Sequence, residues 1–283
     1  MRAYAYAKVN LTLEVFGRRN DGYHALRSVV APISLADELE IETTEDGALS
    51  SDTGYDDDLC LKAARVLRSL VAGPGDLASR KGAVIRVSKR IPAGGGLGGG
   101  SADAAAVLRT LNDLWGLNLS RVDLAEVGAQ VGSDVPALVM GGFVLMEGRG
   151  EKVTPLPNPA AGLNLVLANP GVPCSTKEVY ARCETRQVDA PSAADRMVAA
   201  LSSGELGRIA AAAENDLQAP AIKLCPEIAD VLASLRTAGL TGVTMTGSGS
   251  CVFGLAENED SAMRISARLA SRGIQAWAVQ TLL

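Results

Sequence analysis

The 283-residue sequence has few of the residues that many functional sites need. It contains one histidine, His24, which excludes a metal site built from several histidines. Its five cysteines are widely spaced and form no Cys-x-x-Cys pair, so we expect reduced thiols rather than a disulfide framework or a zinc site. Aromatic residues make up only 4% of the chain, too few for a platform on which single-stranded bases stack.

The chain also lacks an excess of basic charge and long hydrophobic runs. A net charge of −5 argues against a general nucleic-acid binder, but it is compatible with a local basic pocket for one anionic small molecule. Lys8, Asn10 and Glu14 interrupt the apolar residues of the N-terminal segment, and the most apolar stretch, residues 135–146, is too short to span a membrane. We therefore expect a cytoplasmic protein that binds neither nucleic acid nor a membrane.

What is present suits a folded protein of one large or two ordinary domains. Apolar residues make up 47% of the chain and charged residues 21%, which supports a packed core and excludes global disorder. Pro155, Pro157 and Pro159 indicate a boundary. We therefore predict two domains, residues 1–155 and 156–283.

The periodicity of apolar residues predicts a mixture of helices and strands. Residues 4–16 alternate, which predicts a half-buried strand with Lys8, Asn10, Thr12 and Glu14 on its polar face. Further strands are predicted over 38–43, 83–88, 163–168, after Asp134, in two pieces within 242–256, and at the end of the chain. Helices are predicted over 59–70 (ended by residues 73–75), 101–115, 228–235 and 263–272, and from Ser120 onward. This mixture predicts an α+β protein with two lobes, in which the alanine-rich residues 184–222 carry no recognisable chemistry.

Six glycines lie within residues 94–100, between a predicted strand and a predicted helix. Without Cβ atoms, backbone N–H groups can approach an anion, and the N-terminus of the following helix adds a favourable dipole. We expect Ser101 to be the N-cap of that helix. The alternative, a flexible linker, is disfavoured because so little polar spacer surrounds the glycines. The segment therefore predicts a phosphate-binding loop.

The loop does not fit the commonest classes of phosphate-binding motif. A Walker A loop needs lysine at the position of Ser101. The glycines 94, 96 and 99 match the dinucleotide fingerprint, but the acidic residue expected about 20 positions later is missing. The His-Arg-Asp and Asp-Phe-Gly motifs of protein kinases are absent as well.

The segment Pro-Ala-Gly-Gly-Gly-Leu-Gly-Gly-Gly-Ser-Ala at residues 92–102 resembles a motif of the GHMP kinases, the family of galactokinase, homoserine kinase and mevalonate kinase. Further matching segments lie at residues 7–11 with 19–24, 132–136 and 247–253, in the order that the family has them. The similarity extends from about residue 3 to residue 256. Within the family, the N-terminal segments resemble the branch that acts on 4-diphosphocytidyl-2-C-methyl-D-erythritol, hereafter CDP-methylerythritol.

This resemblance implies a fold, a reaction and its cofactors. It implies a two-lobed GHMP kinase fold, with an N-terminal lobe like ribosomal protein S5 domain 2 and a C-terminal α/β sandwich lobe. It also implies that ATP phosphorylates the tertiary 2-hydroxyl of CDP-methylerythritol, giving the 2-phosphate and ADP, in the non-mevalonate route to isoprenoids. Mg²⁺ is expected on the ATP phosphates, with Ser101 and Asp134 as candidate contacts and the metal ligands left open. We expect a monomer or a homodimer.

The resemblance also implies roles for single residues. Lys8 and Asp134 match the catalytic pair, with Asp134 as the base for the substrate hydroxyl. The matched substrate-binding positions are Asn10, Tyr23, His24, Thr176 and Tyr180. Tyr23 and His24 match the cytidine pocket, with His24 at the cytosine edge, Tyr180 on the other face of the cytosine and Thr176 near it. The matched ATP-binding positions are Lys89, Pro92, Ala93, Gly94, Gly95, Gly96, Leu97, Gly98, Gly99, Gly100, Ser101 and Ala102. Asp58 stands where the family has asparagine, so no role is assigned to it.

Elementary chemistry is compatible with these roles. Lys8 and Asn10 are two residues apart in a predicted strand, so both side chains point to one side. A lysine ammonium beside Asp134 would keep that carboxylate ionised and would offset charge on the transferring phosphoryl group.

Other interpretations are possible for the same residues. Lys8 alone could be a solvated strand lysine, Asp134 a turn residue, and Tyr23 with His24 part of a structured turn. The segment Gly247-Ser248-Gly249-Ser250 could be a second wall for the phosphates or a simple hairpin turn. Residues 56–58 are expected to be the solvated N-terminus of a helix. Another GHMP kinase of the homoserine or mevalonate type, or a nucleotide sensor without chemistry, are the alternative functions.

Overall fold

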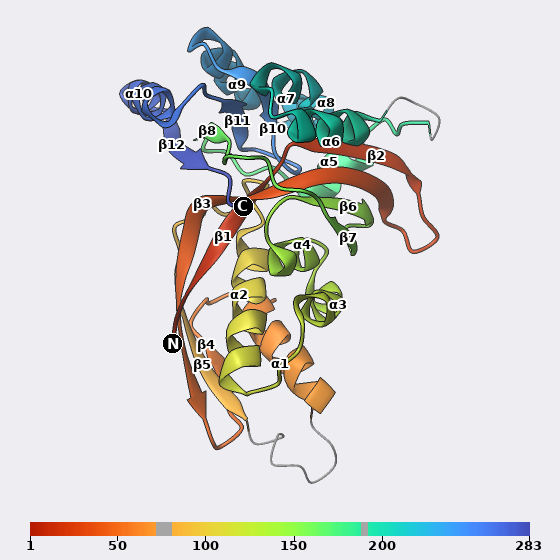
Figure 1. Ribbon diagram of the computed structural model, residues 1–283, viewed down its shortest axis with the longest axis vertical. Helices are drawn as coiled ribbons and strands as arrows, with labels where there is room; N and C mark the ends of the chain where they lie inside the picture. Colours follow the sequence, from red (N-terminus) through yellow and green to blue (C-terminus); the bar gives the residue numbers. More distant parts are fainter. Residues whose placement is uncertain (72–80, 188–191) are drawn as a thin grey trace. The chain divides into compact units, whose positions relative to one another are not determined.

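The computed structural model describes residues 1–71, 81–187 and 192–283, so the predicted helix end at residues 73–75 lies outside the described residues. The chain divides into two compact units, each assembled from several segments (Figure 1). Unit 1 comprises Met1–Ala7, Leu35–Ile91 and Gly98–Met140, and unit 2 comprises Lys8–Ser34, Pro92–Leu97 and Gly141–Leu283. Each unit mixes helices with strands, which confirms the predicted α+β class.

Two strands contribute residues to both units, namely β1 (Arg2–Asn10) and β3 (His24–Thr44). In unit 1, the end of β3 pairs antiparallel with β5 (Gly82–Ser88), and β5 pairs in parallel with β4 (Leu49–Ser51). The helices of unit 1 are α1 (Leu59–Val71), α2 (Gly99–Leu114), α3 (Arg121–Val131) and α4 (Val135–Met140). Helices α1 and α2 pack against each other, and Leu67, Leu108 and Leu111 are fully buried in the core of the unit.

The ends of the unit 1 helices follow the capping rules in two places. Ser120 and Asp123 form the predicted capping box at the start of α3. Asp58 accepts hydrogen bonds from the backbone N–H groups of Cys60 (2.7 Å) and Leu61 (3.1 Å), so it caps α1. The interpretation of residues 56–58 as a helix N-terminus is therefore confirmed.

Two predictions in unit 1 are wrong. The apolar segment after Asp134 is the helix α4, because an apolar run this short does not distinguish a strand from a buried helix, and Pro136 is tolerated in a first helical turn. Helix α2 begins at Gly99, and its N-cap is Gly98, whose φ of 69° lies in the left-handed region. Ser101 therefore lies inside the first turn of α2 and is not its N-cap.

Unit 2 contains two sheets. In one, the first part of β3 pairs with β2 (Thr12–Arg18) and with β6 (Val144–Gly148), β6 pairs with β7 (Lys152–Pro155), and β2 pairs in parallel with β9 (Glu214–Asn215). The other is antiparallel in the order β10-β11-β8-β12 and is formed by β10 (Thr241–Met245), β11 (Val252–Leu255), β8 (Asn164–Asn169) and β12 (Gln275–Gln280). The helices of unit 2 are α5 (Thr176–Ala181), α6 (Ala193–Ser203), α7 (Leu206–Ala212), α8 (Gln218–Leu224), α9 (Glu227–Thr237) and α10 (Glu259–Ala270).

The predicted strand over residues 4–16 needs correction. It is interrupted at Leu11, between β1 and β2, and its polar face is not solvated. Lys8, Asn10, Thr12 and Glu14 are exposed by only 3%, 4%, 0% and 1%, because other segments of unit 2 cover them with polar partners. The face that the pattern marked as polar is therefore a buried polar face.

Most other predicted elements of unit 2 are confirmed, among them the strands at residues 163–168 and within 242–256 and the helix at 228–235. The predicted helix at 263–272 begins four residues earlier, since Asn258 is its N-cap and accepts a hydrogen bond from Ser261 N (2.9 Å). Among the described residues, no helix combines the length and the apolar character needed to cross a membrane.

Candidate active site

Lys8, near the end of β1, is a buried lysine held by two acceptors. Its Nζ donates hydrogen bonds to Asn10 Oδ1 (2.7 Å) and to the carbonyl oxygen of Gly96 (2.9 Å) in the glycine loop. Its backbone N–H donates to the carbonyl oxygen of Leu97 (3.0 Å). A buried ammonium on two fixed acceptors is a preorganised positive charge, so the solvated-lysine interpretation is wrong.

Asn10 connects the strand that carries Lys8 to two other segments of unit 2, β3 and the turn at residues 246–251. Its Nδ2 donates to Ser28 Oγ (2.8 Å), and its backbone N–H donates to Thr246 Oγ1 (2.9 Å). Its Oδ1 accepts from Gly247 N (3.0 Å) as well as from Lys8 Nζ. These bonds fix the side chain of Asn10 and give Lys8 a single orientation.

The turn at residues 246–251 lies directly against the glycine loop. Cys251 N donates to the carbonyl oxygen of Gly95 (3.2 Å). A Cβ placed on Gly96 would lie 2.2 Å from the carbonyl oxygen of Thr246, so only glycine allows this approach. The turn is therefore more than a simple hairpin connection, and its position favours the interpretation as a second wall beside the loop.

Besides Asn10, which is bonded to this turn, the structure brings three further predicted substrate-binding residues close to the turn or to one another. The rings of His24 and Tyr180 stack, with centroids 5.6 Å apart and planes inclined by 26°. Thr176 Oγ1 lies 2.7 Å from Ser248 Oγ, in hydrogen-bonding contact. Two adjacent aromatic rings are suited to hold a flat heterocycle.

Tyr23 is placed differently from His24. Its side chain is 55% exposed, and the guanidinium carbon of Arg149 lies 5.5 Å from the centroid of its ring. Its backbone N–H donates to Asp21 Oδ1 (3.1 Å), so it does belong to a structured turn. Tyr23 therefore precedes His24 in the sequence, but the stack is formed by His24 and Tyr180.

Asp134 and Ser101 belong to unit 1. Asp134 is half-buried and directly precedes helix α4. A Cβ placed on Gly132 would lie 3.7 Å from Ser101 Oγ, so the Ser101 hydroxyl lies against the turn that leads to Asp134. Lys8 belongs to unit 2, and the predicted meeting of Lys8 with Asp134 stays a prediction.

Lys89, the predicted ATP-binding lysine, is held between two buried carboxylates. Its Nζ donates to Asp37 Oδ2 (2.5 Å) and to Asp103 Oδ2 (2.6 Å). Asp37 also accepts from the backbone N–H of Ile91 (2.8 Å), at the start of the glycine loop. A Cβ on Gly99 would lie 3.5 Å from Lys89 Nζ, so this ion cluster lies against the loop at the start of α2.

The cluster perturbs the protonation of its members. Burial raises the pKa of Asp103 to about 6, even though the hydrogen bond and charge of Lys89 act in the opposite direction. Burial lowers the pKa of Lys89, but its hydrogen bonds to Asp103 and Asp37 outweigh burial and raise that pKa overall. The lysine thus stays charged beside the loop.

Sequence reasoning missed Asp37 and Asp103. Asp37 shares a strand face with Leu39 and Ile41, both fully buried, so the period-two pattern itself placed a carboxylate in the core. Asp103 lies just after the first turn of α2, on the stripe that includes Val107. The signal that could have found both residues is a carboxylate at a position where the strand or helix pattern otherwise has apolar, core-facing residues. Among the described residues, no cluster of three or more histidine, cysteine, aspartate or glutamate side chains could hold a metal ion by itself.

Comparison with known proteins gives consistent results for both halves of the chain. Residues 58–142 match the family model "GHMP kinases N terminal domain", and residues 197–275 match "GHMP kinases C terminal". The chain is 42% identical over 272 residues to the 4-diphosphocytidyl-2-C-methyl-D-erythritol kinase of Pelotomaculum thermopropionicum, which covers 94% of this chain and 92% of that protein.

Solved structures agree with this similarity. A crystal structure of 4-(cytidine 5'-diphospho)-2C-methyl-D-erythritol kinase superimposes with a TM-score of 0.83 at 37% identity, covering 99% of each chain. A homoserine kinase from Cytophaga hutchinsonii superimposes with a TM-score of 0.76 at 21% identity, covering 100% of this chain and 94% of that one. At this lower identity the likeness is one of fold alone.

Proposed function

The chain belongs to the 4-diphosphocytidyl-2-C-methyl-D-erythritol kinase family of the GHMP kinases, and on this premise we propose that it transfers the γ-phosphoryl group of ATP to the tertiary 2-hydroxyl of CDP-methylerythritol. The products are ADP and the 2-phosphate of CDP-methylerythritol. The non-mevalonate isoprenoid route uses this 2-phosphate. The observation that carries the proposal is the buried Lys8, fixed by Asn10 against the carbonyl oxygen of Gly96. It places a positive charge at the glycine loop, where a phosphate chain needs one.

ATP binds along the glycine loop in this proposal. The binding residues are Lys89 and residues 92–102, including Ser101 and Ala102 at the start of α2. Backbone N–H groups of the loop and the N-terminus of α2 face the phosphates. Lys89 lies against Gly99, and Asp37 and Asp103 balance its charge, so its proposed contact with the nucleotide is a hydrogen bond.

Lys8 and Asp134 form the catalytic pair. Asp134 accepts the proton of the tertiary hydroxyl, which is a crowded nucleophile and therefore benefits from a positioned base. Lys8 offsets negative charge on the transferring phosphoryl group. Asp134 belongs to unit 1 and Lys8 to unit 2.

Mg²⁺ fits the same proposal through oxygen donors. The Ser101 hydroxyl lies against the turn that precedes Asp134, and hydroxyl and carboxylate oxygens are ligands that Mg²⁺ accepts. These two residues would hold the ion, which neutralises phosphate charge when it is bound. Most of its remaining ligands would be phosphate oxygens and water.

The alcohol binds near the turn at residues 246–251 and the stacked rings of His24 and Tyr180. In this proposal His24 and Tyr180 separate to receive the cytosine between them, which revises the predicted place of His24 at the cytosine edge. Tyr23 keeps its predicted place in the cytidine pocket, and Asn10 and Thr176 hold polar groups of the substrate. The stack of His24 on Tyr180 and the contact between Thr176 and Ser248 support these positions.

The two-domain division at residue 155 is part of the proposal, and the two family matches, at 58–142 and 197–275, support it because they fall on opposite sides of that residue. A cytoplasmic location and a monomeric or dimeric state stay predictions.

An acceptor panel tests the proposed function. The purified chain is incubated with Mg·ATP and CDP-methylerythritol, homoserine or mevalonate, and the products are identified by mass spectrometry. We expect phosphorylation of CDP-methylerythritol alone, together with one ADP for each phosphate transferred. Phosphorylation of homoserine or mevalonate instead would support another GHMP kinase, and ATP binding without ADP formation for any acceptor would support a nucleotide sensor.

A further inference from the structure

The helix that carries two proposed substrate residues has little packing of its own. Helix α5 (Thr176–Ala181) has six residues, and Val179 is its single fully buried side chain. Helices shorter than about 12 residues are marginal without tertiary support. Tyr180 also packs, partly buried, against the core of unit 2, so its exact position depends on this packing and on how the two ends of α5 are held.

The N-terminal end of α5 has two polar anchors. Ser175 is its N-cap and accepts a hydrogen bond from Glu178 N (3.4 Å). The contact between Thr176 and Ser248 attaches the same end to the turn at residues 246–251. Neither contact holds the end where Tyr180 lies.

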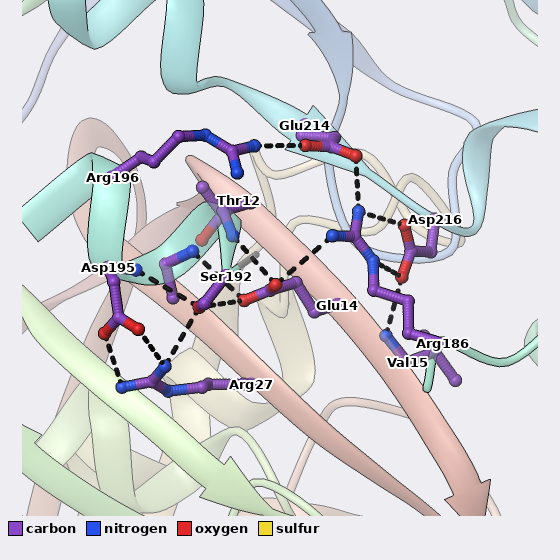
Figure 2. A network of polar contacts seen from close by, with 12 residues as sticks. Thr12, Glu14, Val15, Arg27, Arg186, Ser192, Asp195, Arg196, Glu214 and Asp216 are labelled. Carbon is purple, nitrogen blue, oxygen red and sulfur yellow. Dashed lines mark hydrogen bonds and ion pairs between the residues drawn. The ribbon is translucent and has the colours of Figure 1, made fainter. Parts of the chain in front are cut away.

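The C-terminal end is anchored by Arg186, in the segment that follows α5. Its backbone N–H donates to the carbonyl oxygen of Val15 in β2 (2.8 Å). Its guanidinium donates to both carboxylate oxygens of Asp216 (2.6 Å each), to Glu14 Oε1 (3.3 Å), and to Glu214 (Figure 2). Glu14 lies in β2, and Glu214 in its hydrogen-bonded neighbour β9.

Glu14 is buried and has hydrogen-bond donors of its own. Its two carboxylate oxygens accept hydrogen bonds from Ala193 N (2.8 Å), Ala194 N (3.0 Å) and Ser192 Oγ (3.0 Å) at the start of α6 (Figure 2). A carboxylate bound by a helix N-terminus is favourably placed. Arg186 therefore binds a carboxylate that the start of α6 already holds in place. A shift of the segment after α5 would break this contact rather than move Glu14.

Stability alone does not explain this cluster. The Coulombic gain of a partly buried ion cluster is largely cancelled by desolvation, so apolar residues of similar volume would serve stability as well. However, a planar guanidinium that binds several carboxylates at once closely fixes the position of the chain segment that carries it. What the cluster supplies is the location of the segment that follows Tyr180.

The partner ring is held by the same strand. His24 pairs with Arg18 of β2 in the antiparallel ladder, whereas Tyr180 is attached to β2 through Arg186. Strand β2 is thus the common support of the two stacked rings. We propose that Arg186 is a positioning residue for the cytosine site, which sets the place of Tyr180 opposite His24; this rests on the proposed function.

The expected effect is on substrate affinity rather than on turnover. If Arg186→Met lowers the fraction of molecules with Tyr180 in place to about a tenth, the apparent affinity for CDP-methylerythritol falls about tenfold. At saturating CDP-methylerythritol, binding shifts all molecules to the conformation with Tyr180 in place, so kcat is unchanged. The KM for ATP is unchanged as well. A general loss of structure would instead lower kcat through the active fraction and leave the KM unaltered.

The matched control is Arg27→Met. Arg27 also donates to Ser192 (2.9 Å) and to Asp195 (2.9 Å) at the start of α6, but it lies in β3, whose backbone pairs with β2 and β6 on its two sides. We expect its loss to reduce stability without changing the KM for CDP-methylerythritol. If Arg186→Met does not fold, Arg186→Lys, which keeps the charge and loses the fork, is measured in its place.

A double-mutant cycle tests whether Arg186 acts through Tyr180. In a Tyr180→Ala background, Arg186→Met should raise the KM for CDP-methylerythritol no further. Equal KM values for the wild type and the Arg186 variant, or additive effects in the cycle, would overturn the inference alone. A wild-type protein that neither binds CDP-methylerythritol in titration calorimetry nor phosphorylates it would overturn the proposed function as well.

Discussion

Replacement of Gly96 by alanine tests the close approach of the glycine loop to the turn at residues 246–251. Gly96 has a φ of +75°, and an added Cβ would lie 2.2 Å from the carbonyl oxygen of Thr246 and 3.1 Å from Gly249 N. Both neighbours are backbone groups, which cannot rotate away as a side chain can. Either the loop or the turn must move, and with it the carbonyl oxygen that holds Lys8 Nζ at 2.9 Å.

The magnitude follows from three terms. A left-handed backbone costs an alanine about 1–2 kcal/mol. Overpacking against fixed neighbours adds about 1–3 kcal/mol. Alanine also lowers the conformational entropy of the unfolded chain, which offsets about 0.4–1 kcal/mol of this loss. We therefore expect Gly96→Ala to lower the free energy of unfolding by about 2–4 kcal/mol, and we expect kcat to fall about 100-fold because a misplacement of about 1 Å is costly in catalysis.

Gly116→Ala is the matched control. Gly116 follows α2 with a φ of +63°, and an added Cβ would meet nothing within 4 Å. Gly116→Ala places alanine in the same left-handed backbone conformation but creates no steric clash. Its free energy of unfolding should therefore fall by at most about 2 kcal/mol, with the wild-type kcat retained. Urea unfolding followed by circular dichroism and a coupled assay of ADP release give the two quantities. Equal stability losses in the two variants, with wild-type kcat for Gly96→Ala, would refute the reasoning.

Three further predictions concern charged and aromatic residues of the site. Asp134→Ala should lower kcat by about 10²–10⁴-fold while ATP affinity in calorimetry is retained, and an unchanged kcat would remove Asp134 from the mechanism. His24→Ala should raise the KM for CDP-methylerythritol, and an effect confined to ATP would place His24 on the other ligand. Because burial raises the pKa of Asp103 from 3.8 to about 6, this group favours the folded state below about pH 4, and that contribution is lost as the pH rises through about 6. The free energy of unfolding should therefore fall over this range in the wild type relative to Asp103→Asn, and parallel urea-unfolding profiles would contradict the assignment.

Local patterns predicted the elements whose signal lies within a few residues. The glycine loop between a strand and a helix, the capping box of Ser120 and Asp123, and the paired strands around residues 246–251 all appear in the structure. The family resemblance is confirmed as well. Each of these signals depends on spacing or on turn chemistry that acts locally.

The misplaced predictions depended on contacts between distant segments. The polar face of residues 8–14 alternates correctly, but alternation does not reveal that the turn near Thr246 and the start of α6 cover it. Arg186 and two of its partners, Glu214 and Asp216, lie within residues 184–222, but both partners are about 30 positions from Arg186 and the third partner is Glu14 of β2, so no local pattern shows that they meet. Apolar residues 135–140 were consistent with either helix or strand, and packing in unit 1 decided for the helix.

The most direct test of the proposed reaction is the position of the new phosphate. C2 of the methylerythritol carries no hydrogen, whereas C1 and C3 do. The proton-coupled phosphorus NMR spectrum of the product should therefore show the new monophosphate as a singlet. A triplet or a doublet would place the phosphate on C1 or C3, and it would contradict an active site built to phosphorylate the tertiary hydroxyl.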